Sequence, residues 1–228
     1  MHSSKESDFI FGIKRAAPIV FGYIPVGFAL GVMAADIGLN PLEMGLMSAF
    51  VYAGSAQFIA VNMLGAAANT IAIIITTCLV NSRHLLFSAS LAPHFQGIKQ
   101  KLITFISFFI TDESFAVSIT DAEQGPLSHT YYLGLYITAY LSWIFSTVLG
   151  TKLGSFIPDT KALGFDFALP GMFLVLLCMQ LKNTRYVLVS LISGLLSILF
   201  IYLIPGNWNV ILATVIAAIV GVFIDNED

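Results

Sequence analysis

Charge is what this sequence lacks most. Only 10% of its 228 residues are Asp, Glu, Lys or Arg, whereas an ordinary soluble domain carries about a quarter. The few basic residues form no run of the kind that binds nucleic acid, so we expect no nucleic-acid partner. Cys78 and Cys178 both fall in apolar runs, where we expect core residues and no disulfide. His94 and His129 stand alone in expected loops, so neither a metal nor another cofactor is expected.

What the chain has in place of charge is apolar sequence. Hydrophobic residues make up 57% of it, and its mean hydropathy is +0.89. These values exclude an ordinary soluble protein and predict an all-α polytopic membrane protein that crosses the lipid bilayer several times. We expect one transmembrane domain over 1–228, with an N-terminal tail at 1–15 and an acidic C-terminal tail at 225–228.

The apolar runs, separated at Gly, Pro, Asn and charged residues, predict about eight spans. They cover 16–35, 44–64, 69–92, 102–120, 130–151, 165–181, 186–204 and 208–224. Seven is the alternative count, because only four residues separate the sixth span from the seventh. The halves 16–120 and 130–224 each hold four segments, so an internal duplication is a second open alternative.

Glycine and proline gather in the first span. Gly22, Pro25, Gly27 and Gly31 predict a break near its middle, because proline removes a helical hydrogen bond. Broken helices in transporters expose backbone groups that hold charged substrates, which makes Pro25 and Gly27 candidate binding residues. A simple kink is the alternative, with Gly27 and Gly31 forming a helix-packing face.

A few ionisable residues lie deep within the predicted spans. At about 1.5 Å per residue, Arg83 and Asp112 are both roughly 15 Å from the connection between their two spans. Antiparallel spans would therefore place Arg83 opposite Asp112 or Glu113 near the middle of the membrane. Charged groups are costly there and usually mark a substrate or proton pathway, although a purely structural ion pair is the alternative.

Uncharged polar residues lie at the same depth in the second and third spans. A transport site at this level would be lined by Tyr52, Gly54, Ser55, Gln57 and Asn81, although such groups also form ordinary hydrogen bonds between helices. For proton coupling the candidates are His84, Asp112 and Glu113, since an imidazole ionises near neutral pH. Arg83 and His84 point about 100° apart on a regular helix, so both would face one cavity only if the helix were irregular there.

Four segments carry a resemblance to a known family. They are FGYIPVGFALG (21–31), VYAGSAQF (51–58), NSRHLLFS (81–88) and TDESF (111–115). In this order they resemble the AzlC family, the azaleucine-resistance family of branched-chain amino acid permeases. The resemblance extends over essentially the whole chain.

The resemblance implies a multi-pass protein of the cell inner membrane that exports leucine, valine, isoleucine or their analogues. It also implies a small AzlD-like membrane protein subunit as partner, with this chain as the large subunit. Export by proton antiport is our hypothesis for the mechanism. Two other functions stay open: an ion channel or receptor subunit, and a rhomboid-like intramembrane hydrolase that uses Ser55 and His84.

Overall fold

The computed structural model describes residues 5–154, 156–157, 183–203 and 208–225, together with isolated positions between 164 and 181. Within these residues every regular element is helical and there is no strand. The chain divides into two compact units, Met1–Met172 and Phe173–Asp228. In the second unit, α10 (Thr184–Leu203) packs against α11 (Trp208–Asp225), with Val189 next to Gly221. The prediction of one transmembrane domain remains a prediction.

Three of the predicted spans are each divided into two helices. The pairs are α2 (Pro41–Phe50) with α3 (Gly54–Gly65), α4 (Thr70–Asn81) with α5 (Arg83–Leu91), and α6 (Gln100–Ser107) with α7 (Asp112–Ala122). A short 3-10 helix, η1 (Ala92–Phe95), follows α5. The divisions fall near the middle of the predicted spans, at the depth of the candidate polar residues. Non-helical backbone at membrane depth is tolerated only where protein or a water-filled cavity surrounds it.

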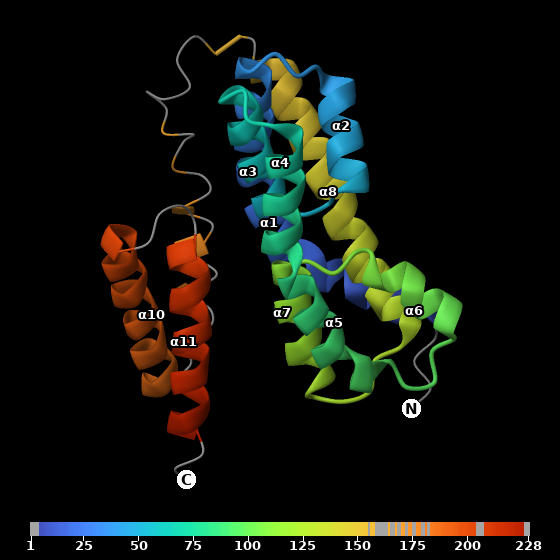
Figure 1. The fold of residues 1–228 in the computed structure, drawn as a ribbon. Helices are drawn as coiled ribbons and strands as arrows, with labels where there is room; N and C mark the ends of the chain where they lie inside the picture. The colour runs from blue at the N-terminus through green and yellow to red at the C-terminus, as the bar shows by residue number, and fades with distance from the viewer. Residues whose placement is uncertain are drawn as a thin grey trace. The chain divides into compact units, whose positions relative to one another are not determined.

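The first span was predicted to break, and that prediction is wrong. Helix α1 (Lys5–Asp36) runs through Pro18 and Pro25 without interruption. It packs along α8 (His129–Gly154), and the two are the central helices of the first unit (Figure 1). A Cβ atom on Gly31 would lie 2.1 Å from the Thr147 carbonyl oxygen, so only glycine permits this approach. Gly27 and Gly31 therefore serve helix packing, the alternative that the sequence left open.

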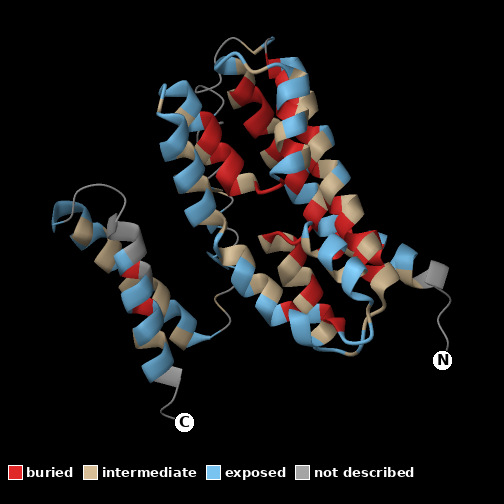
Figure 2. Cartoon of the chain, turned by 45° about the vertical axis from the view of Figure 1, so that its right-hand side comes forward, coloured by how far each residue is buried: buried red, intermediate tan, exposed pale blue. Residues whose placement is uncertain are grey.

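Figure 2 shows the buried residues of the first unit where its helices lie against one another. Many of its exposed residues are large and hydrophobic. Along α4, Ile71, Ile74, Ile75 and Leu79 are all more than half exposed. Cys78 and Cys178 are free, as predicted, but both are exposed and do not lie in a core. Such outward apolar faces are expected of helices that contact lipid.

Four helical segments among the described residues are long and apolar enough to cross a membrane. They are Asp8–Asp36, Thr70–Phe95, His129–Gly154 and Thr184–Leu203. Helix α11 corresponds to the predicted span 208–224, whereas most of the predicted span 165–181 lies outside the described residues. The all-helical class is thus confirmed, and the count of eight spans remains a prediction.

Candidate functional site

The three helix breaks bring polar side chains from distant parts of the chain to one place. Tyr52 lies between α2 and α3, Arg83 begins α5, and Asp112 begins α7. The start of α7 is fixed by its own sequence. Thr111 accepts a hydrogen bond from the Ser114 backbone at 3.3 Å, and the Ser114 hydroxyl accepts one from the Thr111 backbone at 2.8 Å. This reciprocal cap ends the irregular segment and sets where Asp112 and Glu113 project.

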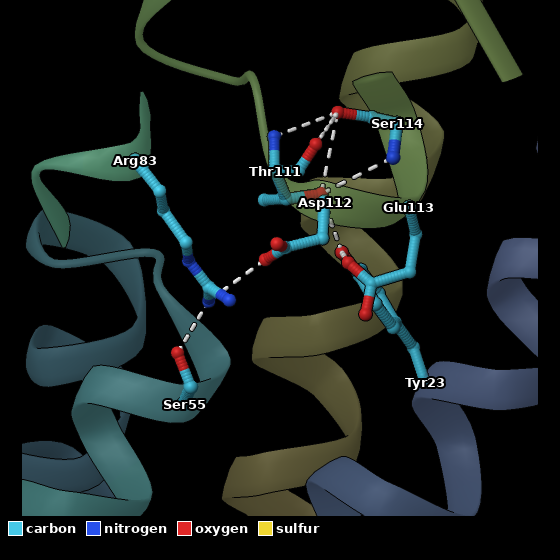
Figure 3. A network of polar contacts seen from close by, with 7 residues as sticks. All are labelled: Tyr23, Ser55, Arg83, Thr111, Asp112, Glu113 and Ser114. Carbon is cyan, nitrogen blue, oxygen red and sulfur yellow. Dashed lines mark hydrogen bonds and ion pairs between the residues drawn. The ribbon is translucent and has the colours of Figure 1, made fainter. Parts of the chain in front are cut away.

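Arg83 connects two of the broken helices. One of its terminal nitrogens, Nη2, lies 2.8 Å from Asp112 Oδ2 and donates a 2.5 Å hydrogen bond to the Ser55 hydroxyl. Figure 3 shows the guanidinium between these two side chains. The Arg83 side chain is 24% exposed and that of Asp112 is 14% exposed, so the pair is largely shielded from solvent.

Glu113 points to the other side of α7, towards α1. Its Oε2 atom accepts a 2.8 Å hydrogen bond from the Tyr23 hydroxyl, which also lies 2.7 Å from the Thr111 hydroxyl (Figure 3). The ring of Tyr23 packs edge-on against Trp143 of α8, with centroids 4.9 Å apart. The second carboxylate is thereby held at the wall formed by the two central helices.

These side chains surround a narrow pocket with a free volume of about 10 Å³, close to what one water molecule needs. Its lining consists of Tyr23, Tyr52, Ala53, Gly54, Ser55, His84, Thr111, Asp112, Glu113 and Trp143. Among the described residues that line or touch the pocket, two carry carboxylates and one a guanidinium. With both carboxylates ionised and His84 neutral, the formal net charge of these groups is −1.

Most of the candidate residues predicted from sequence meet at this pocket. Tyr52, Gly54, Ser55, His84, Asp112 and Glu113 line it, and Arg83 crosses its edge. Arg83 and His84 both reach it because the helix is interrupted at Ser82, which is the irregularity that their different directions required.

Four other candidates lie elsewhere. Pro25 and Gly27 belong to the continuous helix α1, where a Cβ on Gly27 would lie 2.1 Å from the Ser146 hydroxyl. Gln57 accepts a 2.8 Å hydrogen bond from the Trp143 indole and donates a 3.0 Å bond to Ser48, so it links helices. Asn81 lines a separate apolar hollow between α2, α3 and α4.

Tyr23 and Thr111 were not among the predicted site residues. Only Thr111 had a local signal in the sequence. Thr111 precedes Ser114 by three residues, which is the spacing of a capping box. Tyr23 lies two residues before Pro25, at the depth assigned to the site, but a tyrosine in an apolar span has no feature of its own that indicates hydrogen bonding to a carboxylate.

A second polar cluster lies at the other end of α7. The Arg15 guanidinium bonds both oxygens of Asp121, and the Tyr131 hydroxyl donates to the same carboxylate. Asp121 is 7% exposed and joins α7 to α1 and α8. Since Arg15 lies just before the first predicted span and Asp121 just after the fourth, sequence spacing gave no reason to pair them.

The contacts of Ser55 also bear on the hydrolase alternative. The Ser55 hydroxyl accepts its hydrogen bond from Arg83, and His84 Nε2 has no partner among the described residues. A nucleophile and base pair would need these two side chains in hydrogen-bond contact. Within the described residues, Ser55 and His84 line one charged pocket without that contact.

Comparison with known proteins points to one family. The family model described as AzlC protein matches residues 18–157. An uncharacterized membrane protein of Archaeoglobus fulgidus is 33% identical over 88% of both chains. The inner membrane protein YgaZ of Escherichia coli is 32% identical over 82% of this chain and 80% of its own. The branched-chain amino acid transport protein AzlC of Bacillus subtilis is 28% identical over 97% of this chain and 87% of its own. No solved structure matches the chain. The pocket lies within the matched segment, and the chain is a multi-pass membrane protein that belongs to the AzlC family.

Proposed function

We propose that the protein exports branched-chain amino acids such as leucine, valine and isoleucine across the cell inner membrane. Support comes from its membership of the AzlC family and from its similarity to a relative named as a branched-chain amino acid transport protein. The observation that carries the proposal is the Arg83–Asp112 ion pair at a helix break, with Glu113 beside it. Charged groups at such a depth usually meet a charged ligand or a proton.

An amino acid presents one positive and one negative group, and the pocket has partners for both. Arg83 would bind the carboxylate, because a guanidinium matches its planar geometry. Asp112 or Glu113 would bind the ammonium group. The rings of Tyr52 and Trp143 supply an apolar wall for a branched side chain. In this proposal Arg83 and Asp112 pair with each other while no amino acid is bound. When an amino acid binds, its carboxylate takes the place of Asp112 beside Arg83 and its ammonium group takes the place of Arg83 beside Asp112, so the two side chains separate.

The pocket in this structure is closed to such a ligand. Pockets for small molecules usually measure about 300 Å³ or more, far above the free volume between Ser55, His84 and Asp112. Binding therefore requires the helix ends around the pocket to move apart. Breaking the Arg83–Asp112 and Arg83–Ser55 contacts would remove these polar links from α5 to α7 and α3, while Phe87 of α5 stays stacked on Phe115 of α7.

The two neighbouring carboxylates give a reason for proton antiport, which requires the proton and the amino acid to exclude each other. The ammonium group of a bound amino acid favours the ionised form of a carboxylate beside it. Protonation of that carboxylate removes its attraction for the ammonium group, so the proton and the amino acid compete for the site. Glu113 is our candidate for the proton, because Arg83 pairs with Asp112 whereas Glu113 accepts a hydrogen bond from the uncharged Tyr23 hydroxyl. Inward proton movement would then drive amino acid export, with His84 as the other candidate carrier.

Reconstitution tests this function. The chain, expressed together with the small AzlD-like subunit that we propose as its partner, is placed in vesicles loaded with labelled valine. We expect saturable efflux that a pH gradient accelerates, inhibition by leucine and isoleucine, and none by lysine. Efflux from an Arg83→Ala variant at the wild-type rate would show that Arg83 is not part of the mechanism. An efflux rate that does not change with the pH gradient would exclude proton coupling. Full activity without the small subunit would exclude the proposed partner.

A further inference from the structure

Helix α3 begins inside the protein without a side-chain cap. Its N-cap residue, Ala53, has the extended backbone of a capping residue (φ −144°, ψ 92°) but no side-chain oxygen to accept a hydrogen bond. Asn40, Asn69 and Thr111 cap α2, α4 and α7, whereas α5 and α6 lack a side-chain cap as α3 does, so it is burial that sets α3 apart from α5 and α6. The first turn of α3 is buried: Ser55 is 1% exposed and Ala56 is fully buried.

A buried helix end of this kind is an incomplete site. The first N–H groups of a helix have no partner within it, and Ser55 and Ala56, which carry two of these groups, are buried. The aligned peptide dipoles also place a partial positive charge there. Carboxylate or phosphate groups commonly bind at such an end because both effects favour an anion. Gly54 and Ser55, at the start of α3, line the charged pocket.

Tyr52 gives a second and independent indication. Its side chain is 2% exposed and lines the same pocket, yet its hydroxyl makes no hydrogen bond of normal geometry among the described residues, where the Tyr23 hydroxyl is its polar neighbour. Its backbone has φ 37°, a conformation that a non-glycine residue rarely adopts because it is strained. The ring is fixed edge-on against Tyr140, with centroids 4.9 Å apart. A strained backbone thus holds a buried hydroxyl without a hydrogen bond of normal geometry beside the uncapped helix end.

Arg83 supplies the formal charge at this place, because it already bonds the Ser55 hydroxyl in the first turn of α3. We propose that the N-terminus of α3, the Tyr52 hydroxyl and Arg83 together form the subsite that binds the α-carboxylate of the amino acid. This inference rests on the proposed function and assigns one end of its ligand. The sequence suggested that backbone groups at a break in α1 bind a charged group of the substrate. The proposal places this role at the N-terminus of α3, at the break between α2 and α3. The ammonium group then lies on the side of Asp112 and Glu113, at the start of α7.

Two substitutions test the subsite through different atoms. Tyr52→Phe removes only the hydroxyl, and Ala53→Ser adds an oxygen that can cap α3 and compete with a carboxylate for its N–H groups. Because each change relieves an unsatisfied polar group, we expect both variants to unfold at a higher temperature than the wild type. We expect each to bind leucine about 10-fold more weakly or worse, since a hydrogen bond to a charged group is lost. Tyr202→Phe, at a residue 84% exposed, is the matched control and should change neither property.

Affinity is measured on the full chain in nanodiscs, expressed with the small subunit, using leucine and leucinol. Leucinol keeps the ammonium group and the side chain but has no carboxylate, so its dissociation constant should be the same in the wild type and both variants. Unchanged leucine affinity in Tyr52→Phe, or equal weakening of leucine and leucinol, would overturn the subsite. If Ala53→Ser does not fold, Tyr52→Phe decides alone. A wild type that binds no amino acid would contradict the proposed function, which is a different outcome.

Discussion

The charge balance of the pocket makes a prediction about paired substitutions. Arg83 faces Asp112, with Glu113 next along α7, so the wild-type site carries a net charge of −1 when His84 is neutral. Arg83→Gln removes the guanidinium and leaves both carboxylates, so the net charge of the site becomes −2. Asp112→Asn instead leaves Glu113 as the one carboxylate near a guanidinium that still bonds Ser55. The two single variants should therefore differ in stability although they break the same ion pair.

The expected magnitudes follow from the shielding of the pair. Both side chains are less than one quarter exposed, and removing one member of a buried pair costs about 3–5 kcal/mol because the other charge is left uncompensated. We expect that cost for Arg83→Gln. For Asp112→Asn we expect about 1–3 kcal/mol, the cost of weakening a hydrogen bond to a charged group. The double variant has the wild-type charge, so it should be more stable than Arg83→Gln alone.

Denaturation in detergent micelles, followed by tryptophan fluorescence, measures these differences in the four proteins. Trp143 contacts Tyr23 beside the pocket and reports on its integrity. A positive coupling of about 1–3 kcal/mol between the two positions is expected for residues in direct contact. A double variant as unstable as the sum of the single variants would refute the ion pair and the charge count built on it.

Three further predictions concern the framework of the site. Gly31→Ala should lower the thermal midpoint by several degrees, because its Cβ would lie 2.1 Å from the Thr147 carbonyl oxygen; Gly22→Ala, with no atom within 4 Å, is the control. Thr111→Val should destabilise the protein by about 1–2 kcal/mol, since α7 loses its cap, and urea titration measures this. Asp121→Asn should destabilise it by about 1–3 kcal/mol by weakening the bonds from Arg15 and Tyr131; equal urea midpoints would contradict that cluster.

The depth of a residue in a helical span can be read from sequence, and the position of a helix break cannot. Arg83 and Asp112 could be placed opposite each other because the rise per residue is constant and their spans are joined by a short connection. The division of these spans depends on local geometry, such as the left-handed backbone of Tyr52 and the hydroxyl of Thr111. Neither is visible in hydropathy. Proline was the wrong signal, because α1 continues through Pro25, which is exposed, while Gly27 and Gly31 make the tight contact with α8.

Polar residues that share a depth do not share a role. Gln57 lies at about the same depth as Ser55 in the predicted span, but its amide joins Trp143 to Ser48, whereas Ser55 faces the pocket. The difference arises from which neighbour each side chain meets, and that depends on tertiary packing. The Arg15–Asp121 pair shows the same limit, since the two residues come together only when α1, α7 and α8 are assembled.

The central claim is that the pocket recognises a ligand carrying both a carboxylate and an ammonium group, through Arg83 on one side and Asp112 or Glu113 on the other. Counterflow of labelled leucine into vesicles tests it most directly. The vesicles are loaded with unlabelled leucine, with 3-methylbutylamine, which lacks the carboxylate, or with 4-methyl-2-oxopentanoate, which lacks the ammonium group. The account predicts accumulation of label only with leucine inside. Accumulation of equal size with the amine or the oxo acid would contradict it.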